Sequence, residues 1–265
     1  MKADLHIHST ISDGSDDIFK ISELALSRGL DVIAITEHDT LVNCDLINQV
    51  HNLKIVIGAE LSAEYKSKKT RAHLLAYKVK NTTLLNEYMQ PLLDARNRNC
   101  EKQVNILIEQ GFDIDLNKLQ RADNKYLYKQ HIMDYLVKSR QVKEMFGDFY
   151  QNTFKNNGYC DFDIEYFDIF EAITAVKSTG GLAVLAHPGQ QQNFWMIQEL
   201  IDKGLDGIEL NHPSHSKKDR KIINELASRF NLFLCGGSDY HGKFDVNPTT
   251  IGSCLSENSG IQAIC

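Results

Sequence analysis

Seven short apolar segments recur along the 265-residue chain, and this recurrence limits the fold more than any other feature. Runs such as Asp31–Thr36 are typical of strands that are buried on both faces of a sheet. Between them lie amphipathic stretches such as Ser15–Arg28, whose apolar residues have helical spacing. Strands that alternate with helices predict βα units and an α/β fold with a parallel sheet, and seven of them favour a closed barrel. The expected strands are Ala3–Ile7, Asp31–Thr36, Lys54–Ala59, Ala72–Tyr77, Leu182–Ala186, Gly207–Leu210 and Leu232–Cys235.

The middle of the chain departs from this alternation. Residues 81–159 are rich in charge and contain no convincing strand, whereas Leu84–Gln110 and Tyr126–Lys138 have helical periodicity. The sequence therefore predicts a small helical insertion subdomain over residues 81–159. The barrel would be formed by residues 1–80 and 160–265.

Histidines near the amino terminus introduce the chemistry. His6 and His8 are two residues apart on the first expected strand, so their side chains point to the same side. Two converging imidazoles form half of a divalent metal site. Asp4 has the same parity and is interpreted as orienting a ligand, and Asp13 follows in a turn. An isolated pair of this kind is more often two hydrated surface histidines, so the interpretation depends on whether the pattern recurs.

The pattern recurs at the ends of other strands. His38 and His187 each follow an apolar strand, as does Glu60, and His73 lies within one. Because the carboxyl ends of barrel strands meet at one rim, these side chains are expected to converge. The predicted metal ligands are His6, His8, Asp13, His38, Glu60, His73, His187, Asp239 and His241. Asp39 is interpreted as a residue that orients one of them. Nine ligands are too many for one ion and suit two or three ions of Mn, Zn or Fe that share a carboxylate.

Such a cluster suits the hydrolysis of phosphate esters. Neighbouring ions can bind phosphate oxygens and a bridging water, and they lower the pKa of that water so that hydroxide is the nucleophile. No protein nucleophile is then required, and the sequence contains neither a GxSxG elbow nor a P-loop.

Composition excludes some other classes. The net charge is −6, which argues against binding duplex nucleic acid through a broad basic surface. The six cysteines are scattered without a CxxC pair and are interpreted as reduced thiols. No signal peptide and no membrane-spanning apolar run are recognised, so a soluble, cytoplasmic protein is expected. The oligomeric state is left open.

Six segments together resemble one known family. In order along the chain they are DLHIHSTISDGS, AITEHDT, GAELSA, HLLAY, LAHPG and GSDYHG, and they resemble the motifs of the polymerase-and-histidinol-phosphatase (PHP) superfamily. The resemblance implies a distorted seven-stranded barrel with a trinuclear metal site. One ion would be held by His6, His8, Glu60 and Asp239, a second by Glu60, His73 and His187, and a third by Asp13, His38 and His241.

The resemblance also implies residues that contact the substrate. His131 and His215 would reach the substrate phosphate from outside the metal site. Relatives usually carry Arg-Pro-His where this chain has Lys129-Gln130-His131. Lysine keeps the positive charge but lacks the bidentate fork of arginine, so the preference for a second phosphate is left open. His212, which precedes Pro213, is interpreted as structural.

The leading hypothesis is a phosphomonoesterase that acts on a nucleotide or a small phosphorylated metabolite, such as a nucleoside 3′,5′-bisphosphate or AMP. A phosphodiesterase or 5′–3′ exoribonuclease acting on cyclic phosphates or short RNA is the second, and a histidinol-phosphate phosphatase the third. A non-catalytic module ranks low because the ligand set is complete. An amidohydrolase is disfavoured because Asp239 and His241 form a late Asp-x-His pair.

Overall fold

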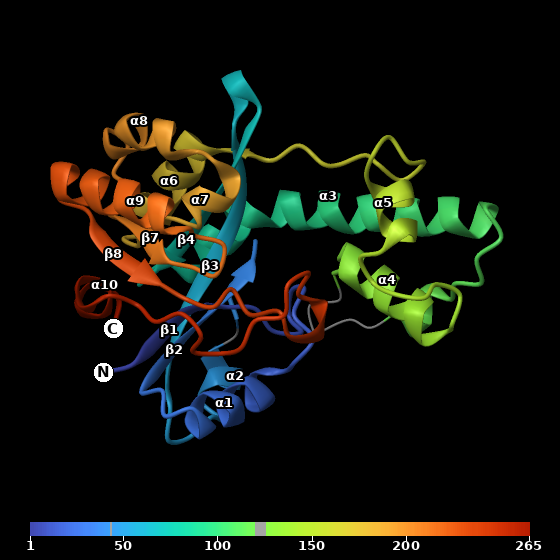
Figure 1. The fold of residues 1–265 in the computed structure, drawn as a ribbon, viewed down its shortest axis with the longest axis horizontal. Helices are drawn as coiled ribbons and strands as arrows, with labels where there is room; N and C mark the ends of the chain where they lie inside the picture. Colours follow the sequence, from blue (N-terminus) through green and yellow to red (C-terminus); the bar gives the residue numbers. More distant parts are fainter. Residues whose placement is uncertain (43, 120–125) are drawn as a thin grey trace.

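The computed structural model describes residues 1–42, 44–119 and 126–265, and a single sheet forms its centre (Figure 1). Neighbouring strands of this sheet follow the order β1-β2-β3-β4-β6-β7-β8, and the short β5 pairs with β3 beside this path. The strands are β1 (Ala3–Ile7), β2 (Val32–His38), β3 (Lys54–Tyr65), β4 (Thr70–Tyr77), β5 (Phe167–Asp168), β6 (Leu182–Leu185), β7 (Gly207–Asn211) and β8 (Phe233–Gly236). The predicted seven-stranded barrel is confirmed as a nearly closed sheet.

The sheet closes where the chain after β8 meets β1. The backbone N–H of Asp239 donates to the carbonyl of His6 at 2.9 Å, and the N–H of His8 donates to the carbonyl of Tyr240 at 3.0 Å. Both contacts lie at the carboxyl end of β1. Closure therefore brings residues 6–8 and 239–240 together at the place where the sequence predicts the site.

One strand runs against the expectation of a parallel sheet. β4 is antiparallel to both of its neighbours, β3 and β6, while the other neighbouring pairs along the path are parallel. β3 continues past its expected end at Ala59 and forms a hairpin with β4, so Glu60 lies inside a strand rather than after it. Because β4 is reversed, its amino-terminal half carries His73 to the rim that the parallel strands reach with their carboxyl ends.

Some helices pack against the outside of the sheet, and others form a separate group with its own core. Asp17 caps the first helix by accepting from the N–H of Lys20 at 2.8 Å, and Gly29 follows its end with a φ of 68°. The helices are α1 (Ile18–Ser27), α2 (Cys44–Ile47), α3 (Thr82–Glu109), α4 (Lys129–Lys138), α5 (Asp148–Phe154), α6 (Ile169–Ser178), α7 (Pro188–Gln191), α8 (Ile197–Ile201), α9 (Lys217–Phe230) and α10 (Asn258–Ile264). No helix in the described ranges combines the length and the apolar character needed to span a bilayer.

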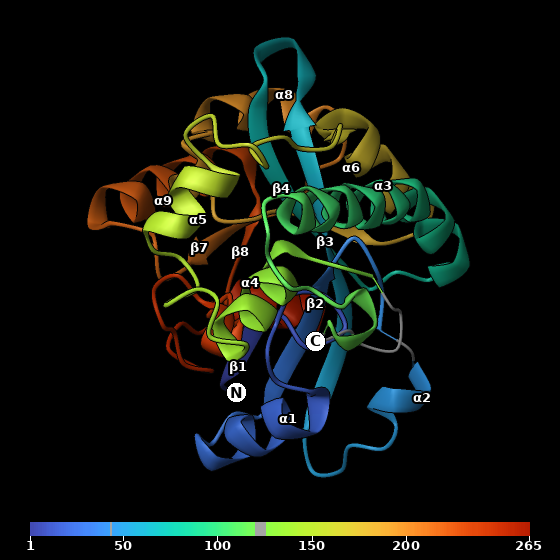
Figure 2. The same cartoon turned by 90° about the vertical axis from the view of Figure 1, so that its right-hand side faces the viewer.

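The long helix α3 belongs to two hydrophobic cores. Leu85 and Met89 in its first half pack into the core between the sheet and α6, whereas Val104 and Leu107 pack with α4 and α5. Figure 2 shows α3, α4 and α5 in front of the strands when the molecule is viewed from the insertion side. The exact division at residues 81–159 stays a prediction, but this segment has a core of its own.

Tyr77 crosses the interior of the barrel. It lies on β4 and is fully buried, and its hydroxyl donates to the carbonyl of Leu5 on β1 at 2.5 Å. These strands are not neighbours in the sheet. The bond therefore links opposite walls of the barrel.

We expect Tyr77→Phe to lower the free energy of unfolding by about 1–3 kcal/mol, because the ring stays while a buried carbonyl loses its donor. Urea unfolding followed by circular dichroism measures the change. Tyr159→Phe is the control, since Tyr159 is exposed. Equal urea midpoints for the two variants would show that the cross-barrel bond contributes nothing.

Candidate metal centre

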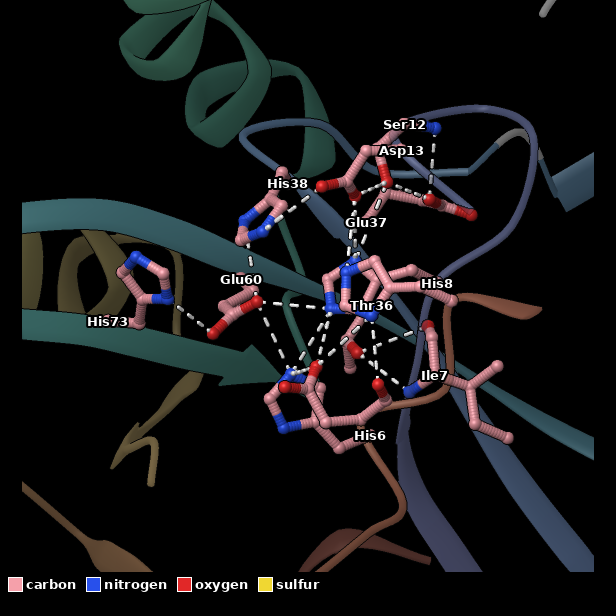
Figure 3. Close-up of polar contacts among 12 residues, drawn as sticks. His6, Ile7, His8, Ser12, Asp13, Thr36, Glu37, His38, Glu60 and His73 are labelled. Carbon is pink, nitrogen blue, oxygen red and sulfur yellow. Dashed lines mark hydrogen bonds and ion pairs between the residues drawn. The ribbon is translucent and has the colours of Figure 1, made fainter. Parts of the chain in front are cut away.

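His6 and His8 lie at the end of β1 and form one wall of the site (Figure 3). Both rings are fully buried, and their Nε2 atoms are only 3.2 Å apart. Two imidazole nitrogens this close on the same side of a strand are arranged to share a ligand. The expectation that the two side chains point to the same side is thus met by the geometry.

The carboxylate of Glu60 stands at the centre of the histidines. Its Oε2 lies 3.3 Å from His6 Nε2, 3.1 Å from His8 Nε2 and 3.3 Å from His38 Nδ1. Its Oε1 lies 2.8 Å from both His73 Nδ1 and His187 Nε2. Each oxygen therefore faces a different group of rings, as a bridging carboxylate requires.

Two aspartates and a further histidine complete the cluster. Asp239 Oδ1 lies 3.3 Å from the Nε2 atoms of both His6 and His8. Asp13 Oδ1 lies 3.4 Å from His241 Nε2, and its Oδ2 lies 3.8 Å from His38 Nε2. Ligand atoms converge within 4.8 Å of one another in three groups: His6 with His8, Glu60 and Asp239; His8 with Asp13, His38 and His241; and His38 with Glu60 and His73. The structure thus brings together all nine predicted ligands, with His187 joined to them through Glu60.

The unsatisfied polar atoms of the cluster fit a site for cations. Within the described part of the chain, His38 Nδ1, His187 Nδ1 and Asp239 Oδ1 are buried without a hydrogen-bond partner. Buried polar atoms normally have hydrogen-bond partners. His38 Nδ1 and Asp239 Oδ1 instead have ion-pair contacts of 3.3 Å, to Glu60 and to His6 and His8. Imidazole nitrogens and carboxylate oxygens suit Zn, Mn or Fe.

Burial and neighbouring charges shift the pKa values of residues in the cluster. Burial favours the neutral form of His38 and lowers its pKa to about 4. Burial also acts to lower the pKa of His6, but Glu209, Asp239 and Glu60 outweigh it and raise that pKa well above its usual value. Burial likewise acts to raise the pKa of Glu60, yet the surrounding imidazoles hold it well below its usual range. The directions of these shifts favour an ionised Glu60 beside a protonated His6 and a neutral His38.

Two further buried carboxylates, those of Glu209 and Glu37, support the predicted ligands. Glu209 Oε1 lies 3.1 Å from His6 Nδ1, and its Oε2 accepts from the N–H of His187 at 2.8 Å. Glu37 accepts from the N–H groups of Ser9 and Ser12, which fixes the loop between His8 and Asp13. The sequence analysis missed both glutamates. Glu209 lies on β7 between the core residues Ile208 and Leu210, and no spacing in the sequence links it to His6.

Asp4 and Asp39 bind the backbone rather than a ring. Asp4 accepts from the N–H groups of Ser238 and Gly252, and burial raises its pKa to about 6. Asp39 accepts from the N–H of Ser62 at 2.7 Å. Both carboxylates bind backbone N–H groups near the predicted ligands and do not bind a ligand ring. A role in orienting the ligands, as the sequence predicts for them, would therefore act through the backbone.

Three residues of the site have left-handed backbone conformations. The φ angles are 57° at Asp39, 24° at His187 and 50° at Asp239. Non-glycine residues seldom adopt such angles, and they persist where the surrounding structure enforces them. His187 and Asp239 are predicted ligands and Asp39 directly follows one, so the backbone is strained at three positions of the site.

The predicted substrate residues lie in several environments. His215 accepts from the N–H of Gly189 and donates to the carbonyl of Leu210, so both ring nitrogens bind the backbone. His131 accepts from the N–H of Tyr128. Burial lowers the pKa of Lys129, which starts α4. Substrate roles for Lys129, His131 and His215 stay predictions.

A pocket of about 690 Å³ opens over the cluster. Gln130 is the member of the Lys129–His131 segment that lines it, and its amide donates to Asp13 Oδ2 at 2.9 Å. Phe146 and Tyr150 from the predicted insertion also line this pocket. His212, interpreted as structural from the sequence, also lines it, and its Nε2 lies 3.2 Å from Asp239 Oδ2.

Comparison with known proteins assigns the family. Residues 4–212 match the PHP domain family. The chain belongs to this family. It is 38% identical over 251 residues to the phosphoribosyl 1,2-cyclic phosphate 1,2-diphosphodiesterase of Eggerthella lenta, covering 92% of this chain and 95% of that protein. It is 26% identical to the 3′,5′-nucleoside bisphosphate phosphatase of Chromobacterium violaceum, covering 99% of this chain and 93% of that protein.

A solved structure supports the same assignment. The chain superposes on a Bifidobacterium adolescentis protein, assigned as a metal-dependent phosphoesterase, with a TM-score of 0.87 and 25% identity, covering 99% of this chain and 94% of that chain. The PHP resemblance and the barrel are thereby confirmed. The protein is a metal-dependent PHP phosphoesterase, and hence a hydrolase of phosphoester bonds.

We expect metal binding to release protons. The pKa values of His6 and His241 are raised by neighbouring carboxylates that outweigh burial, so both rings carry protons at neutral pH that an ion must displace. Metal affinity should therefore fall as pH falls. Calorimetric titration of Mn²⁺ in buffers with different ionisation enthalpies measures the release. His51→Gln, at an exposed histidine, should leave it unchanged. Equal binding enthalpies in all buffers would contradict the expectation.

We expect Glu209→Gln to weaken metal binding about 10–100-fold, because His6 loses the carboxylate that fixes its ring orientation. Competition with a chelator of known affinity measures the change. The control is Glu225→Gln, which removes an exposed carboxylate on α9. An unchanged affinity in a folded Glu209→Gln protein would remove Glu209 from the support of the site.

Proposed function

We propose that this phosphoesterase acts on a phosphate ester of ribose, and that a ribosyl cyclic phosphate is its preferred substrate. The Glu60 carboxylate, whose two oxygens face separate groups of histidines, carries the proposal of a multinuclear phosphoesterase. The 38% identity to a ribosyl cyclic phosphate diesterase over nearly the full length of both chains supports the diester.

The nine ligands would hold two or three ions of Mn, Zn or Fe. When bound, such ions polarise phosphoryl oxygens and provide hydroxide near neutral pH. Hydrolysis adds a water oxygen to phosphorus and breaks one bond between phosphorus and a ribose oxygen, which takes up a proton. This chemistry requires no serine or cysteine nucleophile.

The chain itself would position the substrate. Asp13 is held by Gln130, and Asp239 by His212, so each aspartate keeps one oxygen directed at the histidine cluster. Phe146 and Tyr150 form an aromatic wall of the pocket. A pocket of about 690 Å³ accepts a molecule of nucleotide size.

A phosphomonoester of a nucleoside bisphosphate is the second candidate. The size of the pocket and the bisphosphate phosphatase of Chromobacterium violaceum among the relatives favour it. Lys129 is half-buried and starts the helix that also presents Gln130 to the pocket, so it could serve a second phosphate only after moving its ammonium group. We therefore rank the monoester below the cyclic diester as a candidate substrate.

We expect the protein, loaded in turn with Mn²⁺, Zn²⁺ and Fe²⁺, to hydrolyse ribosyl 1,2-cyclic phosphate faster than a nucleoside 3′,5′-bisphosphate, AMP, histidinol phosphate or short 5′-phosphorylated RNA. Asp239→Asn should lower kcat about a hundredfold or more, because a metal supplies several kcal/mol of transition-state stabilisation. Phosphate release and chromatography of the products measure both results. Faster turnover of a monoester would favour the second candidate, and no turnover of any ester with any ion would contradict the proposal.

A further inference from the structure

Arg96 contacts residues near the predicted ligands His38 and Glu60 from outside the barrel. It lies in the middle of α3, in the segment that the sequence assigns to the insertion. Its guanidinium Nη2 donates to Asp39 Oδ2 at 2.6 Å and to Ser62 Oγ at 2.9 Å. The contact to Asp39 spans 57 positions of sequence. One arginine thus joins the insertion helix to both β2 and β3.

Asp39 is the residue on which this contact acts. It directly follows His38 and has a left-handed backbone with a φ of 57°. Its N–H donates to the carbonyl of Glu60 at 3.0 Å, and its Oδ1 accepts from the N–H of Ser62 at 2.7 Å. Asp39 therefore ties the end of β2 to β3 at the place where His38 and Glu60 face each other.

Arg96 and Asp39 form a buried ion pair, and each neutralises the charge of the other. The Asp39 carboxylate is fully buried, and the Arg96 side chain is only 17% exposed. Burial acts to lower the pKa of Arg96, but the adjacent Asp39 carboxylate outweighs it and raises that pKa, so the guanidinium stays charged. Removing one member of a buried ion pair leaves the other charge without compensation. Without Arg96, the buried Asp39 carboxylate would lose its counter-charge, which favours its departure from the left-handed turn.

A second contact from the same region supports the turn. The hydroxyl of Tyr128, the residue before α4, donates to the carbonyl of His38 at 2.9 Å. The Tyr128 ring lies 5.3 Å from the Arg96 guanidinium carbon. Side chains of residues 81–159 therefore bind the His38 carbonyl and the Asp39 carboxylate, one on each side of the bond between these two residues.

We propose that Arg96 is a positioning residue of the metal centre, which acts through Asp39 to hold His38 in line with Glu60. This rests on the proposed binding of ions by His38 and Glu60. Arg96 does not contact the ligand atoms, so it would act on the geometry of the His38 site and leave the group of His6, His8, Glu60 and Asp239 in place.

Metal stoichiometry and hydrogen exchange test the proposal on the full-length protein. Arg96→Met removes the charge and keeps much of the side-chain volume. We expect it to bind its weakest Mn²⁺ about 10–100-fold less tightly, in line with other outer partners of metal ligands, while the tighter ions stay bound. Amide exchange in the metal-free protein should accelerate in peptides that contain Asp39 and Ser62. Arg96→Lys should recover most of both effects, because a lysine ammonium can still pair with Asp39.

Matched variants separate this role from general stability. Arg98→Met replaces an exposed arginine two residues further along the same helix and should change neither readout. If Arg96 acts through Asp39, the double variant Arg96→Met with Asp39→Asn should bind Mn²⁺ no more weakly than Asp39→Asn alone.

The outcomes that overturn the proposal are defined by the same measurements. Unchanged Mn²⁺ binding and unchanged exchange at Asp39 and Ser62 in a folded Arg96→Met protein would overturn it. If Arg96→Met does not fold, Arg96→Lys and the double variant decide, and additive losses in the double variant would overturn it. Neither readout requires catalysis, so the test stands even if none of the proposed phosphate esters is hydrolysed.

Discussion

The Glu60 carboxylate contacts five imidazoles, which come from β1, β2, β4 and the end of β6. A buried carboxylate and a buried imidazolium each cost several kcal/mol of desolvation, and only close pairing offsets this. The barrel has to close before Glu60 can meet all of its partners, so the site and the fold form together.

The surrounding carboxylates follow from the same constraint. A ring that faces Glu60 or an ion with one nitrogen needs a partner for the other, and Glu209 supplies it for His6. Glu37 and Asp4 satisfy backbone N–H groups in the loops that carry Asp13 and Asp239. Such buried acids contribute less to stability than apolar residues of similar size would. Their contribution is to the position of the ligands.

The sequence predicts the ligands better than it predicts their supports. His6 and His8 share a strand, and His38 and His187 follow apolar strands, so local patterns are enough to find them. The reversed β4 was missed because parallel and antiparallel strands have similar apolar runs, yet His73 was found because its strand was recognised. Glu209 and Arg96 were missed for a different reason. Their partners are 203 and 57 residues away, and no spacing marks a contact that only tertiary structure creates.

The role of the helical insertion follows from which groups it presents to the barrel. Its helix α3 shares one hydrophobic core with the sheet and another with α4 and α5, so it is fixed at both ends. From this rigid base, Gln130 reaches Asp13 and Arg96 reaches Asp39. Gln130 also lines the pocket, together with Phe146 and Tyr150. Residues 81–159 therefore line the pocket and also contact the loops that carry predicted ligands. Ions that bind only the folded centre stabilise the segments that hold it, so metal binding at the proposed ligands would be linked to the folding of residues 81–159.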